Sequence, residues 1–253
     1  MTTAGSLSGK VAIITGSARN MGRAFAVSLA RRGADVTVHH HGQSAKGDAE
    51  ETVHLIHEQG ARAIIVDGDL ADVKVVKRLF DATMEAFGRV DIVINNAGVV
   101  IKKPFTDITE ADFDRSFDIN AKAAFFVMQE AARRIADNGR IINMGTTILG
   151  ATIPFYSVYA GAKAALEDFT RSLAREIGHR GVTVNVIAPG PIDTAFYHGA
   201  ETPESVARAT TASVAGRLGR VADIVPMIEF LASPQSQWVT AQTLFVNGGY
   251  LAR

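Results

Sequence analysis

The sequence predicts an α/β fold in which helices cover both faces of a parallel sheet of about seven strands. Short runs rich in valine and isoleucine alternate with helical stretches of about 10 to 20 residues, which is the pattern of successive βαβ units. The strand-like runs are continuously apolar, as expected for parallel strands buried on both faces. The chain has 253 residues, 47% of them hydrophobic, and no composition shift, repeat or low-complexity linker divides it. We therefore expect a single domain over residues 1–253.

The expected elements follow one another in alternation. The expected strands cover residues 11–15, 35–40, 63–66, 90–94, 140–144, 183–187 and 243–246. The expected helices cover residues 21–32, 45–59, 73–87, 111–136, 157–179 and 222–232. Gly33, Gly60 and Gly88 each follow a helix directly, where glycine adopts the left-handed conformation without strain. The helix over 111–136 is expected to break near Asp118.

The stretch 189–219 is the least regular part of the chain. Pro189, Pro191 and Pro203 fall within it, together with several glycines. A loop this long inside a compact domain is usually functional. We expect residues 190–219 to form a lid over a substrate site.

Charge and composition exclude several classes of protein. Lysine plus arginine number 26, as do aspartate plus glutamate, so no basic excess favours nucleic-acid binding. The chain has no cysteine, which excludes disulfides, thiol catalysis and cysteine-based zinc sites. The first ten residues lack the apolar stretch of a signal peptide, and no run of about 18 apolar residues predicts a membrane span. We expect a cytoplasmic protein without nucleic-acid or membrane partners.

A glycine-rich turn over residues 15–22 joins the first expected strand to the first helix. At this place in a doubly wound, Rossmann-like fold, glycines let the backbone approach a pyrophosphate, and the helix N-terminus offers free N–H groups. A P-loop is excluded, because five residues separate Gly16 from Gly22 and Arg23 follows where that motif requires lysine. No G-x-S-x-G element occurs, which excludes an α/β-hydrolase nucleophile elbow. The turn therefore predicts a dinucleotide site.

Tyr159 and Lys163 stand four residues apart near the start of the expected helix 157–179. This spacing places both side chains on one helix face, about one turn apart. A phenol titrates near 10 in water, and a nearby ammonium favours the phenolate. Such a tyrosine can exchange a proton with a carbonyl or an alcohol. The spacing alone fits a surface pair on a helix equally well.

With its other motifs, the chain resembles the short-chain dehydrogenase/reductase family over residues 10–249. The family's glycine turn resembles residues 15–22, and its Asn-Asn-Ala-Gly element stands at residues 95–98, after the fourth strand. Its Tyr-x-x-x-Lys pair stands at Tyr159 and Lys163, and its Pro-Gly follows the sixth strand as Pro189 and Gly190. The resemblance implies an oxidoreductase that transfers a hydride between a nicotinamide cofactor and a carbonyl or secondary alcohol.

The resemblance also implies roles for individual residues. Tyr159 would be the general acid in reduction and the base in oxidation, while Lys163 would lower the tyrosine's pKa and bind the nicotinamide ribose. The family's catalytic serine, which polarises the carbonyl, corresponds to Thr146, with Thr147 as the second candidate. Threonine has the hydrogen-bonding capacity of serine, although its β-branch makes it stiffer. Asn120 matches the family's structural asparagine, which helps a water-based proton relay.

NADP(H) is expected in preference to NAD(H). An acid at the end of the second strand normally accepts the ribose hydroxyls of NAD. No aspartate or glutamate occurs between residues 36 and 46, and His40 takes the acid's place. Arg19 matches a basic position in NADP-preferring relatives, and a guanidinium suits phosphate by its forked donors. His41 and Ser44 can add contacts.

The implied cofactor contacts depart from the family at Asn20, which replaces the middle glycine of the turn. Asparagine tolerates positive φ better than other non-glycine residues, so we expect the turn to survive, slightly tighter around the cofactor. Asp69 resembles the family's adenine contact or else a helix cap, and Thr194 resembles its carboxamide contact. The full set of implied contacts is Gly16, Arg19, Asn20, Met21, Gly22, His40, His41, Asp69, Leu70, Asn96, Ala97, Gly98, Tyr159, Lys163, Pro189, Gly190, Ile192 and Thr194.

Several alternatives stay open at this point. Histidines 39–41 are not expected to bind a metal, because neighbours on a strand point to opposite faces and no carboxylate stands beside them. A nucleotide-binding sensor without turnover, or a scaffold subunit, is the alternative to an enzyme. Relatives usually form tetramers, so a homotetramer is expected. A lipophilic or small neutral carbonyl substrate is favoured over a charged one by the largely apolar residues expected in the pocket, which are Ile148, Leu149, Ile153, Phe155, Phe196 and Tyr197. A ketoacyl thioester or a sugar derivative stays open as an alternative.

Overall fold

The computed structural model describes residues 7–151 and 153–252, and it contains one sheet of seven parallel strands. The strands lie in the order β3-β2-β1-β4-β5-β6-β7. They are β1 (Val11–Ile14), β2 (Asp35–His40), β3 (Ala63–Asp67), β4 (Ile92–Asn95), β5 (Arg140–Met144), β6 (Thr183–Pro189) and β7 (Thr243–Val246). The predicted doubly wound parallel sheet is therefore confirmed.

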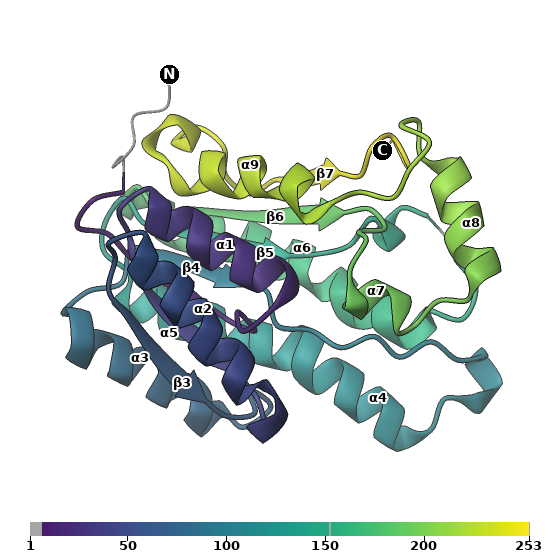
Figure 1. Ribbon diagram of the computed structural model, residues 1–253, viewed down its shortest axis with the longest axis horizontal. Coiled ribbons are helices and arrows are strands. Elements are labelled where there is room, and N and C mark those ends of the chain that lie inside the picture. Colours follow the sequence, from purple (N-terminus) through teal and green to yellow (C-terminus); the bar gives the residue numbers. More distant parts are fainter. Residues whose placement is uncertain (1–6, 152, 253) are drawn as a thin grey trace.

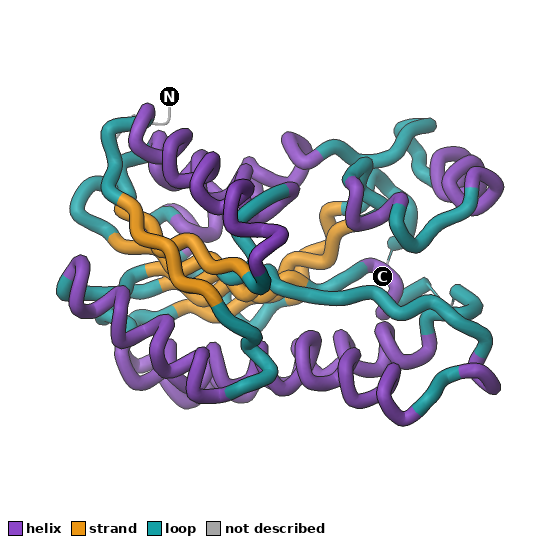
Figure 2. The backbone as a smooth tube through the Cα atoms, turned by 60° about the horizontal axis from the view of Figure 1, so that its bottom comes forward, coloured by secondary structure: helices purple, strands orange, loops and turns teal. Residues whose placement is uncertain are grey.

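Helices cover both faces of this sheet (Figures 1 and 2). One face carries α1 (Asn20–Arg31), α2 (Lys46–Glu58) and α9 (Val221–Ala232). The other carries α3 (Val73–Phe87), α5 (Ala124–Arg134) and α6 (Ser157–Ile177). Neighbouring residues of one strand serve opposite faces, since Ile14 packs with Phe25 of α1 whereas Ile13 packs with Phe80 of α3. The continuously apolar strands are thus explained by burial on both sides.

The predicted break near Asp118 is a π-helical segment. The expected helix over 111–136 is divided into α4 (Glu110–Phe117), the π-helical segment η3 (Asp118–Ala123) and α5. Thr109 begins α4 with a capping box, in which its side chain accepts from the backbone N–H of Asp112. Such π-helical insertions are frequent at functional sites. Here the segment places Asn120 inside the protein, fully buried.

The stretch 189–219 is more regular than predicted. It contains α7 (Ala195–His198) and α8 (Pro203–Ala212), so the expectation of an irregular loop was wrong. Thr202 and Ser205 form a capping box at the start of α8, and Pro203 occupies its first turn. A proline there is favourable, because the first helical N–H has no partner inside the helix. In Figure 1, α7 and α8 lie on the side where β6 and β7 end.

The remaining segments are short. In the part of the chain that the structure describes, the 3₁₀ turns are η1 (Gln43–Ala45), η2 (Phe105–Asp107), η4 (Thr147–Leu149), η5 (Gly178–Arg180) and η6 (Pro234–Ser236). None of the helices that the structure describes is long and apolar enough to cross a membrane. The strand order reverses between β1 and β4, and in such sheets a ligand crevice opens at the carboxyl ends of the strands flanking this point.

Candidate active site

The tyrosine and lysine of α6 are both buried, about one helical turn apart. Tyr159 and Lys163 are 7% and 4% exposed. A hydrogen bond joins the Tyr159 side chain to Thr146, and Lys163 Nζ donates to the carbonyl oxygen of Met144 at 2.7 Å. Met144 ends β5, so the helix and the adjoining strand hold the two functional side chains together.

The structure separates the two threonines that the sequence left as candidates. Thr146 lies at the start of η4, where its Oγ1 accepts from the backbone N–H of Ile148 at 3.4 Å and the side chain also bonds Tyr159. Thr147 instead donates from Oγ1 to the carbonyl oxygen of Ala188 on β6, at 3.1 Å. Thr146 is therefore the hydroxyl that reaches the tyrosine, and Thr147 fastens η4 to the sheet.

Burial dominates the protonation of both groups. It raises the pKa of Tyr159 to about 12, although the hydrogen bond with Thr146 acts in the opposite direction. Burial also lowers the pKa of Lys163 to about 8. That Lys163 lowers the tyrosine's pKa stays a prediction, because burial has the largest influence on both groups in this structure. Lys163 donates a hydrogen bond to the carbonyl oxygen of Met144. Removal from water favours the neutral form of both Tyr159 and Lys163.

Asn120 holds the segment after β4 in place. Its Oδ1 accepts from the backbone N–H of Val99 at 3.1 Å, and its Nδ2 donates to the carbonyl oxygen of Val99 at 2.9 Å and to Ser116 Oγ at 3.3 Å. The space is tight, because a Cβ on Gly98 would lie 3.0 Å from Asn120 Oδ1 and 3.5 Å from Lys163 Nζ. Asn120 and Lys163 therefore flank the same backbone segment.

The glycine turn closes against the end of β4. Gly16 has φ 63° and Asn20 has φ 51°, so the asparagine adopts the left-handed conformation expected of it. A Cβ on Gly22 would lie only 2.3 Å from the carbonyl oxygen of Gly16, which explains glycine at this position. Asn96 Nδ2 donates to the carbonyl oxygens of Thr15 and Gly16 at 3.0 and 2.9 Å. The turn and the Asn-Asn-Ala-Gly element thus form one unit.

His39 fastens this turn from the other side, and the sequence did not reveal that role. Its Nδ1 accepts from the backbone N–H of Gly16 at 3.1 Å, and its Nε2 lies 2.9 Å from the carbonyl oxygen of Gly68. A carbonyl can only accept, so the ring is assigned the tautomer with its proton on Nε2. Burial lowers the pKa of His39 to about 4. The histidine is a neutral cross-link between the turn and the end of β3.

Two adjoining cavities lie at the carboxyl ends of the strands. The larger, about 270 Å³, contains most of the expected cofactor contacts: Gly16, Arg19, Asn20, Met21, Gly22, His40, His41, Asp69, Leu70, Asn96, Ala97, Gly98 and Thr194. The smaller, about 100 Å³, is lined by Thr146 and Tyr159 together with Pro189, Gly190 and Ile192. Met21, Thr194 and Phe196 line both. The turn and the buried tyrosine therefore face one continuous region.

Charged side chains gather at the far end of the larger cavity. Asp69 accepts from the backbone N–H of Ala71 at 3.0 Å and from Arg115 Nη1 at 2.7 Å. Burial raises the pKa of Asp69, but these two hydrogen bonds outweigh it and the pKa is lowered. The cap of α3 is Asp72 instead, so Asp69 is not a helix cap. Arg115 lines the cavity too and was not predicted.

His40 and His41 stand at the same end but differ in exposure. His40 Nδ1 is buried and makes no hydrogen bond, although it lies 3.4 Å from Asp67 Oδ1. His41 is half-exposed, with its Nε2 3.8 Å from Asp69 Oδ2. Within residues 7–151 and 153–252, no group of three or more histidine, aspartate or glutamate side chains is placed to hold a metal ion. A buried donor without a partner is a group that a polar ligand can satisfy.

The smaller cavity lies between Thr146 and Tyr159 and the stretch 190–219. Met21, Val100 and Tyr156 line it, as do the predicted Phe196 and Tyr197. The other four predicted pocket residues, Ile148, Leu149, Ile153 and Phe155, are not among its lining residues. Phe155 has φ 73° and is 53% exposed, so its backbone turns the ring outward.

A buried carboxylate joins this stretch to the rest of the protein. Glu201, just before α8, is 5% exposed at its side chain and pairs with Lys102 Nζ at 2.6 Å. The hydroxyls of Tyr156 and Ser205 also donate to the Glu201 carboxylate. Lys102 lies over the Tyr156 ring, 5.2 Å from its centroid. Sequence reasoning could not find this network, because its members come from three separate loops and the first turn of α8 and form no motif.

The comparisons with known proteins agree with one another. Residues 16–251 match a family model described as enoyl-(acyl carrier protein) reductase. The hydroxynaphthalene reductase-like protein Arp2 of Metarhizium majus is 40% identical, with 96% of each chain covered. A short-chain type dehydrogenase/reductase of Picea abies is 38% identical, covering 96% of this chain and 93% of its own.

Solved structures agree closely with this one. A proposed dehydrogenase of Burkholderia cenocepacia, crystallised with NADP, is 39% identical and superposes with a TM-score of 0.95, covering 100% of this chain and 97% of its own. The angucycline C-6 ketoreductase LanV with bound NADP is 34% identical, with a TM-score of 0.91 and 98% of each chain covered.

Proposed function

The chain belongs to the short-chain dehydrogenase/reductase family, and on that premise we propose that it is an NADP(H)-dependent reductase of neutral ketones. One observation carries the proposal. Tyr159 and Thr146, joined by a hydrogen bond, line a cavity that shares three residues with the cavity of the glycine turn. A substrate carbonyl that accepts hydrogen bonds from Tyr159 and Thr146 would therefore face the cofactor bound at the glycine turn.

The residues of the larger cavity fit a phosphorylated nicotinamide dinucleotide. Two solved relatives hold NADP, and the cavity is lined by the turn, which includes Arg19, and by Arg115 and the histidines. The unpartnered Nδ1 of His40 offers a polar contact there. The first turn of α1 presents N–H groups and the positive end of its dipole to a pyrophosphate. When bound, the nicotinamide ring supplies or accepts the hydride.

The protein's own residues manage the proton. In reduction, Tyr159 gives its hydroxyl proton to the carbonyl oxygen as that oxygen gains charge, while the carbonyl carbon receives the hydride. The product is the secondary alcohol, and the tyrosine is left as a phenolate that must be reprotonated. Thr146 donates to the same oxygen and fixes its position. We propose that Lys163, with Asn120 beside it, stabilises this phenolate and begins its reprotonation. Oxidation of an alcohol is the reverse.

The lining of the smaller cavity favours a flat, apolar ketone. Aromatic or sulfur-containing side chains surround it, namely Met21, Tyr156, Phe196 and Tyr197. Such side chains stack on rings and offer few partners to a charged group. Two similar proteins have names that denote aromatic ring systems, a hydroxynaphthalene reductase-like protein and an angucycline ketoreductase. We therefore place fused-ring ketones ahead of 3-ketoacyl thioesters and keto sugars.

The proposal also covers the lid, the oligomeric state and the location of the protein. Residues 190–219 act as a lid over the smaller cavity, and Glu201 holds this lid to the rest of the protein. The protein forms a homotetramer, because Phe125 is 40% exposed while its ring packs edge-on against Phe169 at the surface of α5 and α6. We place the protein in the cytoplasm; the chain contains no cysteine, so its fold depends on no disulfide. Sedimentation at micromolar concentration and cell fractionation test the last two points.

A substrate panel tests the proposed function. NADPH oxidation is followed at 340 nm with fused-ring ketones, simple ketones, 3-ketoacyl thioesters and keto sugars, and NADH is run in parallel. We expect turnover with NADPH, highest for the neutral fused-ring ketones. Turnover confined to anionic substrates would contradict the apolar preference. Tight binding of NADPH without turnover of any substrate would instead indicate the non-catalytic sensor.

A further inference from the structure

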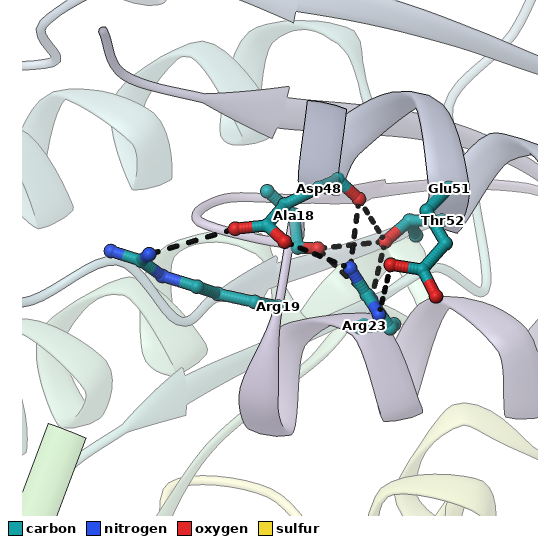
Figure 3. A network of polar contacts seen from close by, with 6 residues as sticks. All are labelled: Ala18, Arg19, Arg23, Asp48, Glu51 and Thr52. Carbon is teal, nitrogen blue, oxygen red and sulfur yellow. Dashed lines mark hydrogen bonds and ion pairs between the residues drawn. The ribbon is translucent and has the colours of Figure 1, made fainter. Parts of the chain in front are cut away.

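An acidic side chain from α2 stands beside the arginine expected to bind phosphate. Asp48 lies in the first turn of α2, and its Oδ2 is 3.5 Å from Arg19 Nη1. Its other oxygen, Oδ1, is 3.5 Å from Arg23 Nη2. Figure 3 shows the carboxylate between the two guanidinium groups. Asp48 therefore places a negative charge beside the arginine of the glycine turn.

The two arginines depend on Asp48 to different degrees. Arg23 is largely covered and is fixed by other groups as well, namely the carbonyl oxygens of Ala18 and Asp48, the hydroxyl of Thr52 and the carboxylate of Glu51. Arg19 is 63% exposed at its side chain, and Asp48 is the ion-pair partner that the structure gives it. Removing the Asp48 charge would therefore leave Arg23 and the turn in place while freeing Arg19.

We propose that Asp48 is a specificity-determining residue that weakens the binding of the 2′-phosphate of NADP(H) through Arg19. This inference rests on the proposed function. A carboxylate at ion-pair distance cancels part of the guanidinium charge, and it stands close to the place where a phosphate dianion must bind. The 3.5 Å separation is longer than a strong charge-assisted bond, so Arg19 remains available to a phosphate but is shared.

The cofactor preference of the site follows from this arrangement. NADH has no 2′-phosphate, so its affinity does not depend on the charge of Asp48. NADPH gains from Arg19 but loses part of that gain to the neighbouring acid. The protein therefore prefers NADPH by a smaller ratio than Arg19 alone would give, and it retains measurable use of NADH.

Binding measurements on Asp48→Asn test the inference without any turnover. Titration calorimetry gives the Kd values of NADPH and NADH, together with those of 2′,5′-ADP and 5′-AMP as probes with and without the 2′-phosphate. We expect Asp48→Asn to tighten NADPH and 2′,5′-ADP by about three- to fivefold, the size of one exposed ion pair. NADH and 5′-AMP should not change. The gain should shrink at about 0.5 M salt, where exposed charges are screened.

Glu51→Gln is the matched control, because this residue of the same helix pairs with Arg23 and not with Arg19. It should leave all four Kd values unchanged. In an Arg19→Gln background, Asp48→Asn should tighten NADPH by less than it does in the native background, because only the repulsion between Asp48 and the phosphate is left to remove. Unchanged or weakened NADPH binding in Asp48→Asn would overturn the inference while leaving the proposed function standing. A native protein that binds neither dinucleotide would overturn both.

Discussion

Protonation of His39 should destabilise the fold in acid, because this ring is buried and neutral. Its Nδ1 accepts from Gly16 and therefore cannot carry a proton without losing that bond. Burial lowers its pKa from 6.5 to about 4. Above pH 6.5 the ring is neutral in both folded and unfolded chains, and its full contribution to stability is present. As pH falls from 6.5 toward 4, only the unfolded chain binds the proton, so stability is lost.

The size of the effect follows from that difference in pKa. At about 1.4 kcal/mol per pH unit, the change from 6.5 to about 4 corresponds to about 3 kcal/mol. The test compares the wild type with His39→Asn, which does not titrate and whose Oδ1 can still accept from Gly16. The free energy of unfolding in urea is measured between pH 7 and pH 4. Circular dichroism is the better probe, because the single tryptophan, Trp238, is 98% exposed.

The prediction concerns the difference between the two proteins. The wild type should be the more stable at pH 7, and its advantage over His39→Asn should fall by about 3 kcal/mol by pH 4. Other titrating groups act on both proteins and cancel. Gln59→Asn is the control: this residue is exposed at the end of α2 and does not titrate, so its substitution should give a difference that stays flat. A constant difference between wild type and His39→Asn would refute the account of His39 as a neutral cross-link.

Three further changes test other parts of the site. Gly22→Ala places a Cβ 2.3 Å from a backbone oxygen and should weaken NADPH binding at least tenfold by calorimetry, whereas Gly47→Ala, which meets nothing within 4 Å, should leave binding unchanged. Thr146→Ala should lower kcat by about 100-fold in steady-state kinetics, and Thr146→Ser should keep at least a third of it; equal losses would show that the hydroxyl is not used. Glu201→Gln should raise KM severalfold with little change in kcat, because the lid loses its ion pair while the chemistry is untouched.

The sequence predicted those parts of the fold whose determinants are local. The strands at 35–40, 140–144 and 243–246 and the helix at 73–87 have the predicted bounds, since apolar runs and terminal glycines mark their ends. The stretch 189–219 was misjudged. Its prolines and glycines suggested a loop, yet Pro203 occupies the first turn of α8, where proline favours a helix.

The candidate site was likewise predictable only in part. Tyr159 and Lys163 lie on one helix as their spacing implied, and Thr146 reaches Tyr159 as the family resemblance implied. The burial that raises the pKa of Tyr159 was not foreseen, because burial cannot be read from the spacing of two residues. The pairing of Arg19 with Asp48 was also missed, because it depends on how α2 packs beside the turn.

In the proposed reaction, a hydride passes between NADPH and a ketone while Tyr159 supplies the proton. Turnover with NADPH carrying two deuterium atoms at nicotinamide C4 tests it most directly. We expect one deuterium on the carbinol carbon of the product, and we expect Tyr159→Phe to retain NADPH binding while kcat falls by about 10²- to 10⁴-fold. A product without deuterium, or a Tyr159→Phe variant that turns over at the native rate, would contradict the account.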